Sequence, residues 1–89
     1  MKIDYHKSFT KSYKKIDFKI RDKFKNRLRI FMKNPFSKEL NNHSLSWKYL
    51  WKKSINVTWN FRAIFKEKSN NTYEFIEFVD IWTHSELYK

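Results

Sequence analysis

The C-terminal end of the chain carries the side chains best suited to chemistry. Residues 83–89 read Thr-His-Ser-Glu-Leu-Tyr-Lys, and they follow a run of aromatic and β-branched residues at 73–82 that predicts a buried strand. His84 and Tyr88 therefore bring an imidazole and a phenol to the end of a rigid element. An imidazole can donate or accept a proton near neutral pH, so this segment is a candidate site for acid–base chemistry.

Composition excludes several classes of protein. The chain has 89 residues, no cysteine and no glycine, and 4 Trp, 5 Tyr and 9 Phe supply a core for a single domain spanning residues 1–89. The lack of cysteine excludes disulfides and thiolate metal sites, and the lack of glycine excludes the Gly-rich phosphate loops of P-loop and Rossmann enzymes. We find no apolar run that predicts a membrane span or signal peptide, and we expect a cytoplasmic protein with no membrane partner.

The charge of the chain predicts a polyanionic partner. The net charge is +11, and most of the surplus lies in residues 1–40, which hold 13 Lys and Arg against 4 Asp and Glu. Such a surplus favours encounter with nucleic acid and supplies phosphate contacts. An acidic protein, an anionic membrane surface or simple solvation of helix faces would also account for it.

The N-terminal half predicts a short strand and two helices. Residues 2–5 alternate as in a strand, and Ser8 is the expected N-cap of a first helix carrying Phe9, Tyr13 and Ile16 on one face. Asp17 is the expected N-cap of a second helix that ends before Asn34-Pro35. Its predicted core-facing residues are Ile20, Phe24, Leu28, Phe31 and Met32.

The C-terminal half predicts a sheet. Residues 36–46 are polar and predict an irregular connection, whereas residues 55–61 alternate apolar and polar side chains as a strand does. We expect a turn near residues 58–60, a strand at 61–66, a hairpin turn at 69–72 and the strand at 73–82. The predicted order is β-α-α-β-β-β, an α+β fold in which a short strand and a helical hairpin pack on a small, mostly antiparallel twisted sheet.

Three segments resemble one family of proteins. They are Leu40-Asn-Asn-His-Ser-Leu45, the strand containing Phe61-Arg62-Ala63-Ile64-Phe65-Lys66, and the terminal Thr83-His84-Ser85-Glu86-Leu87-Tyr88. Together they resemble the RelE/ParE toxin superfamily, nearest its YafQ-like branch, and the predicted element order agrees with the RelE-like fold. The resemblance implies a type II toxin that cuts mRNA in the ribosomal decoding site and is inhibited by a cognate antitoxin. The RNA 2′-hydroxyl is the nucleophile, so this reaction needs an acid, a base and positive charge, and no metal or cofactor.

The resemblance also assigns roles to four residues. His84 corresponds to the family's C-terminal catalytic histidine and His43 to a histidine of its loop, and either imidazole can transfer protons. Arg62 corresponds to a phosphate-binding arginine and Tyr88 to an aromatic that stacks on or orients a base. Each also has a structural interpretation: His84 closing the core, His43 an exposed loop residue, Arg62 a solubilising charge and Tyr88 an anchor for the tail.

Further RNA contacts and departures from the family pattern complete the predicted site. Lys48, Lys52 and Lys53 are candidate backbone contacts, although a solvated strand face also explains them, and Trp82 is a candidate stacking surface in place of the usual glycine. The remaining departures are Asn56 and Asn60, where related toxins commonly have a histidine and an aspartate, and Asp80, where an arginine is common. Either Asp80 points away from the phosphate or the protein is a weak or degenerate toxin. The alternative function is a non-catalytic one, as a ParE-like gyrase inhibitor or as a partner that only binds its antitoxin.

Overall fold

The N-terminal half folds as predicted, with one change of cap. The computed structural model describes residues 1–83 and 85. It has a strand β1 (Lys2–Tyr5) and two helices, α1 (Lys7–Lys15) and α2 (Phe18–Lys33). Asp17 caps α2 as predicted, accepting a 2.9 Å hydrogen bond from the backbone N–H of Lys19. The prediction of Ser8 as the cap of α1 is wrong, because His6 is the cap: its Nδ1 accepts a 3.0 Å bond from the N–H of Ser8.

The connection predicted as irregular contains short elements. The 3₁₀ helix η1 (Lys38–Leu40) is followed by a two-residue strand, β2 (His43–Ser44), and by a second 3₁₀ helix, η2 (Trp47–Tyr49). The side chain of Leu40 is fully buried, which fixes η1 against the rest of the fold. His43 is therefore a strand residue rather than a loop residue.

Three longer strands complete the chain, at β3 (Lys53–Asn56), β4 (Phe61–Glu67) and β5 (Phe75–Thr83). The predicted turn near residues 58–60 is confirmed, and Thr58 stabilises it by accepting bonds from the backbone N–H groups of Asn60 and Phe61. The final strand begins two residues later than predicted, because Tyr73 has the left-handed φ of 59°.

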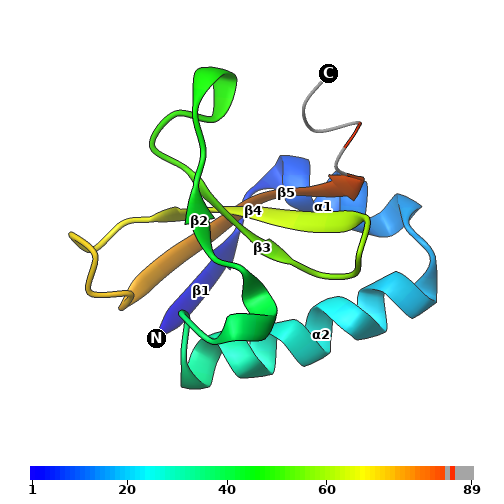
Figure 1. Ribbon diagram of the computed structural model, residues 1–89. Helices are drawn as coiled ribbons and strands as arrows, with labels where there is room; N and C mark the ends of the chain where they lie inside the picture. Colours follow the sequence, from blue (N-terminus) through cyan, green and yellow to red (C-terminus); the bar gives the residue numbers. More distant parts are fainter. Residues whose placement is uncertain (84, 86–89) are drawn as a thin grey trace.

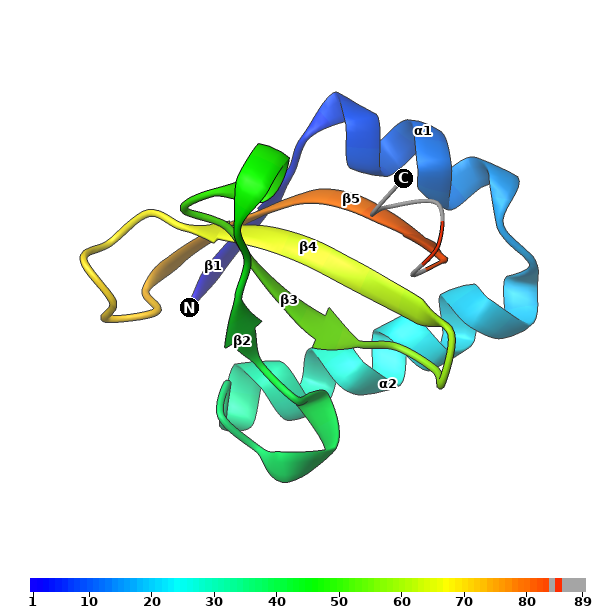
Figure 2. The ribbon, with the colours of Figure 1, turned by 45° about the horizontal axis from the view of Figure 1, so that its top comes forward.

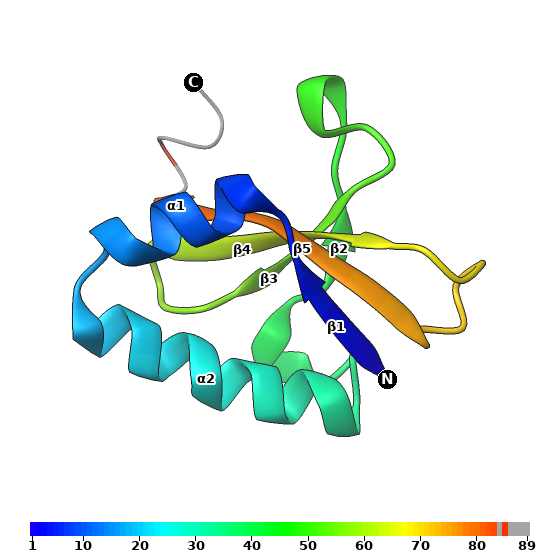
Figure 3. The same cartoon turned by 180° about the vertical axis from the view of Figure 1, so that it is seen from behind.

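The sheet has the order β1-β5-β4-β3-β2, with β1 parallel to β5 and the other neighbours antiparallel. This arrangement confirms the predicted α+β class and adds β2 as a fifth strand. Helix α2 crosses one face of the sheet, while the segment between β2 and β3 rises on the other side (Figure 1). Figure 2 shows β4 in the middle, between β3 and β5, and Figure 3 shows α1 beside β5.

The core lies between α2 and the sheet and consists largely of aromatic rings. Phe24 meets Phe78 edge to face at 5.2 Å, and Phe31 meets Phe65 in the same way at 5.0 Å. The prediction that Met32 lies in this core is wrong, because half of its surface is exposed. Within the described part of the chain, neither helix has the length and apolar character needed to cross a bilayer.

Candidate active site

Arg62 lies in the middle of a row of residues that crosses three strands. It is opposite Asn56 on β3 and opposite Trp82 on β5. Residues paired in this way project from the same face of a sheet, so Asn56, Arg62 and Trp82 share one face. Ala63 and Ile81, the next pair along, face α2 and are fully buried. The Arg62 row therefore lies on the face opposite the core.

A second row of residues on this face contains His43 and Ser54, and Ser54 is the hydrogen-bond partner of Arg62. His43 is opposite Ser54, Ser54 is opposite Ile64, and Ile64 is opposite Asp80. Nη1 of Arg62 donates a 3.0 Å hydrogen bond to Oγ of Ser54, whose side chain is fully buried. Directly opposed residues of antiparallel strands have Cα atoms about 4.5–5.5 Å apart. Ser54 is thus the strand partner of His43 and the hydrogen-bond partner of Arg62, two predicted residues that are 19 positions apart in sequence.

The environment of His43 selects one tautomer of its neutral ring. Its Nδ1 lies 2.8 Å from the carbonyl oxygen of Asn41, and a carbonyl oxygen can only accept. Nδ1 therefore carries the proton, and Nε2 of the neutral ring has a lone pair available. The side chain of His43 is exposed. An exposed imidazole whose Nε2 has no hydrogen-bond partner in the described part of the chain can act as a general base.

The carboxylate of Asp80 is engaged by α1. A register shift between Ile64 and Phe65 makes Phe78 and Asp80 face opposite sides of the sheet, and this bulge puts Asp80 on the Arg62 side. Its Oδ1 accepts 2.7 Å and 2.8 Å bonds from the Ser12 hydroxyl and its neighbour Ile81's backbone N–H. These bonds direct its charge toward α1, which supports the interpretation that Asp80 points away from a bound phosphate.

The three predicted lysines do not lie together. Lys48 is exposed and stands 5.1 Å over the Tyr49 ring, and Lys52, two residues before Ser54, continues the Arg62 face. Lys53 lies on the opposite face, since it is paired with the core residue Phe65. Its Nζ donates 3.2 Å bonds to side-chain oxygens of the 67–75 hairpin.

The two positions where the family commonly has ionisable residues differ in their placement. Asn56 is in the row of Arg62, but its amide cannot transfer a proton. Asn60 lies in the turn before β4, where its backbone N–H bonds to Thr58. Trp82 packs edge to face on Phe61, with ring centroids 6.3 Å apart, which places an aromatic surface beside Arg62.

The C-terminal candidates His84 and Tyr88 lie outside the described residues. Thr83, directly before His84 in the sequence, pairs with Phe61, the neighbour of Arg62. Sequence reasoning did not identify Ser54 as the partner of Arg62, or Lys66 on the same face of β4. The alternation of side chains between the two faces of a strand could have identified them. It predicts that Ser54 shares a face with Asn56, and that Lys66 shares a face with Arg62.

A scan against protein-family models finds no match, and neither does a search of curated protein sequences. Solved structures do match. YafQ from E. coli strain BL21(DE3) aligns with a TM-score of 0.80 at 18% identity, over 99% of this chain and 98% of YafQ. A YoeB/ParE toxin from Agrobacterium tumefaciens gives 0.74 at 17% identity, over 94% and 99%.

An antitoxin–toxin complex also matches. The RelB–RelE complex from Methanococcus jannaschii gives a TM-score of 0.71 at 16% identity, over 96% of this chain and 94% of the matched chain. These alignments extend over nearly the whole chain. The chain therefore has the fold shared by the RelE, ParE and YafQ toxins.

Proposed function

We propose that the protein is the toxin of a type II toxin–antitoxin system and cleaves mRNA on the ribosome without a metal ion. The observation that carries this proposal is that Ser54 is both the strand partner of His43 and the hydrogen-bond partner of the Arg62 guanidinium, on the sheet face opposite α2. A base and a fixed cation are what a phosphodiester needs for attack by its own 2′-hydroxyl. The net charge of +11 favours an RNA substrate.

The proposed reaction forms a 2′,3′-cyclic phosphate and frees a 5′-hydroxyl. Nε2 of His43 takes the 2′-hydroxyl proton as the 2′-oxygen bonds to phosphorus, and His84 gives a proton to the leaving 5′-oxygen. Arg62 binds the non-bridging oxygens, and its charge stabilises the phosphorane. In this scheme the bond to Ser54 holds the guanidinium in the orientation that the phosphate requires.

Neighbouring residues would hold the RNA. Lys48 and Lys52 are proposed phosphate contacts, and Trp82 and Tyr88 are proposed stacking surfaces. Lys53 has its ammonium group on Tyr73 and Asn71, so it is a poorer candidate for this face. Translating ribosomes place the reaction in the cytoplasm.

The proposed protein partner is a cognate antitoxin with an acidic or amphipathic helix. The matched RelB–RelE structure contains an antitoxin with its toxin. For this chain, the basic surplus offers such a helix a complementary surface. A small protein encoded next to this gene should restore growth when co-expressed and should co-purify with the chain.

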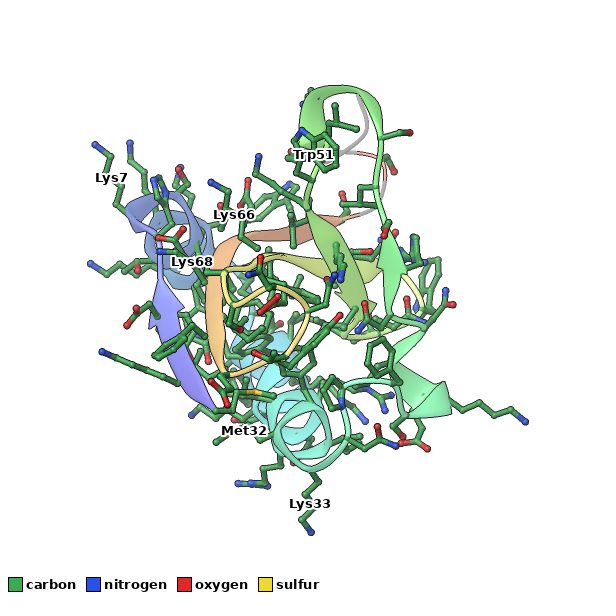
Figure 4. All side chains as sticks on the ribbon, turned by 90° about the vertical axis from the view of Figure 1, so that its left-hand side faces the viewer. Lys7, Met32, Lys33, Trp51, Lys66 and Lys68 are labelled. Atoms are coloured by element: carbon green, nitrogen blue, oxygen red, sulfur yellow. The ribbon has the colours of Figure 1, made fainter. Side chains whose placement is uncertain are left out.

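Induced expression in a bacterial host tests the catalytic proposal. The wild type should arrest growth and produce new mRNA 5′ ends on ribosomes, whereas Arg62→Ala and His84→Ala should restore growth and His43→Ala should slow single-turnover cleavage. Lys33→Ala, an exposed change on the far side of α2, is the control and should remain toxic (Figure 4). Arrest that persists in both the Arg62 and His84 variants, with mRNA intact, would reject the proposal.

A non-catalytic function is the second candidate. The amides of Asn56 and Asn60 cannot act as general acids or bases, and the Asp80 carboxylate lies on the Arg62 side of the sheet. Both features are compatible with a ParE-like gyrase inhibitor or with a degenerate toxin. Gyrase-dependent DNA cleavage with intact mRNA would favour the first of these, and antitoxin binding without growth arrest would favour the second.

A further inference from the structure

Trp51 is an exposed aromatic residue in an unfavourable backbone conformation. It has a φ of 71°, in the left-handed region, and 85% of its surface is exposed. A bulky residue is disfavoured there because its Cβ approaches the backbone. An 85% exposed ring buries too little surface to compensate through packing. Such a residue at a loop tip suggests a role outside folding.

Trp51 lines an open groove between two segments of the chain. One wall is formed by residues 44–45 and 50–53, and the other by residues 67–68 and 70–71, around a volume of about 710 Å³. Figure 4 shows Trp51 on the loop that rises above the sheet, with Lys66 near the end of β4 and Lys68 directly after that strand. The groove thus has an aromatic ring on one wall and a cation on the other.

The charge of the groove is positive. Lys52, Lys53 and Lys68 contribute three cations, and Glu67 contributes one anion. The Glu67 carboxylate already accepts three hydrogen bonds within the 67–75 hairpin. The donors are the backbone N–H of Asn71 and the N–H and hydroxyl of Ser69. Lys52 and Lys68 make no such internal bond among the described residues, so both are available to an anion.

The groove continues directly from the candidate active site. Leu45 and Lys52 line the groove and lie two residues from His43 and Ser54, so they continue the face of His43, and the N–H of Leu45 donates a 2.9 Å bond to the carbonyl oxygen of Lys52. Residues two positions apart along a strand are separated by about 6.6 Å. A nucleotide bound at His43 would therefore place its neighbour in the chain within reach of the groove.

We propose that this groove binds single-stranded RNA, with a base stacked on Trp51 and backbone phosphates on Lys52 and Lys68. The inference rests on the proposed function, because it extends the same RNA strand from His43 to a neighbouring nucleotide. Single-stranded RNA presents phosphates and base faces in alternation. The groove offers lysine cations for the phosphates and one exposed tryptophan ring for a base. A helical protein partner would instead need apolar side chains along the groove on both walls. Leu45 and Leu50 lie on one wall only, and the wall formed by residues 67–68 and 70–71 consists of charged and amide side chains.

Binding of a fluorescent 12-nucleotide RNA with 2′-O-methyl riboses tests the proposal, because this RNA cannot be cleaved. Trp51→Ala should weaken binding about 5- to 150-fold, and Trp51→Phe should retain most of the affinity. Trp59→Ala is the matched control: Trp59 is 95% exposed, lies at the other end of β3 and is not part of the groove, so its removal should leave the affinity unchanged.

Salt dependence separates stacking from charge. Lys52→Ala with Lys68→Ala should flatten the slope of log K against log salt by about 1.4, that is by about 0.7 for each lost phosphate contact, whereas Trp51→Ala should leave the slope unchanged. Wild-type affinity in Trp51→Ala, or equal weakening in Trp51→Ala and Trp59→Ala, would overturn the proposal. Binding of an acidic helical peptide at Trp51 in preference to RNA would also overturn it.

The two proposals fail separately. If mRNA is cleaved on ribosomes but Trp51→Ala binds the 2′-O-methyl RNA with wild-type affinity, only the groove proposal is rejected. If the 2′-O-methyl RNA binds through Trp51 but Arg62→Ala and His84→Ala still arrest growth with intact mRNA, only the catalytic proposal falls. Thermal unfolding of each variant verifies that the comparison is made between folded proteins.

Discussion

The guanidinium of Arg62 donates a 3.0 Å hydrogen bond from Nη1 to the hydroxyl oxygen of Ser54, a side chain with no exposed surface. This bond joins neighbouring strands, β4 and β3, and Ser54 is in turn opposite His43 on β2. Two sequence segments that carry proposed catalytic groups are therefore linked through one buried serine. Among the described residues, the other N–H groups of Arg62 make no hydrogen bond, so they can bind an anion from solvent.

Ser54→Ala tests whether this bond orients Arg62. Hydrogen bonds to charged groups contribute about 1.5–3 kcal/mol, so we expect the single-turnover rate of mRNA cleavage on ribosomes to fall roughly tenfold or more. Stability should change little, because the partly exposed guanidinium can bond to water instead. Ser8→Ala, an exposed change on α1, is the control. An unchanged rate in Ser54→Ala would show that Arg62 is oriented by other contacts.

The helices were predictable from sequence because their signals are local. The signals for α2 lie within one continuous segment: the Asp17 cap, the buried Phe24 and Phe31, and the Asn34-Pro35 stop. Each of these affects the backbone at or near its own position. The turn before β4 was predictable for the same reason. Met32 was misplaced because it lies at the margin of the apolar face, where a small rotation of the helix decides exposure.

The candidate site was less predictable because it depends on pairing between strands. Strict alternation from Ile76 and Phe78 would place Asp80 in the core, and only the bulge turns it to the Arg62 side. The Arg62–Ser54 bond and the pairing of His43 with Ser54 likewise depend on register, which no single segment specifies. The family resemblance supplied His43 and Arg62 as candidates, and the fold supplied their common neighbour.

Asp80→Asn tests the effect of the one carboxylate in the His43 row. An amide oxygen can still accept from Ser12 and Ile81, so the fold is preserved while a negative charge is removed. We expect cleavage to accelerate about 2- to 5-fold at low salt, and less at high salt, because exposed charge interactions are worth up to about 1 kcal/mol and are screened. A loss of activity as large as that of Arg62→Ala would instead indicate that Asp80 transfers protons.

Glu67 makes stability depend on pH. Burial acts to raise the pKa of Glu67, but hydrogen bonds from Ser69, Asn71 and Tyr73 together outweigh it and lower that pKa from its ordinary 4.5. A lowered pKa in the folded state stabilises the fold above pH 4.5, and this stabilisation disappears as the pH falls through the folded value. Glu67→Gln should therefore unfold at lower urea concentration than wild type at pH 7, and this gap should narrow as the pH falls below 4.5. A constant gap would contradict this, and Glu74→Gln is the exposed control.

Trp51→Gly and Trp51→Ala separate the backbone strain at this residue from the function of its ring. At a φ of 71° alanine retains the Cβ that opposes the left-handed conformation, whereas glycine has none. We expect Trp51→Gly to be about 1 kcal/mol more stable than Trp51→Ala in urea unfolding, although glycine loses more backbone entropy on folding. Both variants should lose the same RNA affinity, because both lack the ring. Equal stability of the two variants would mean that residue 51 leaves the left-handed region once the tryptophan is removed.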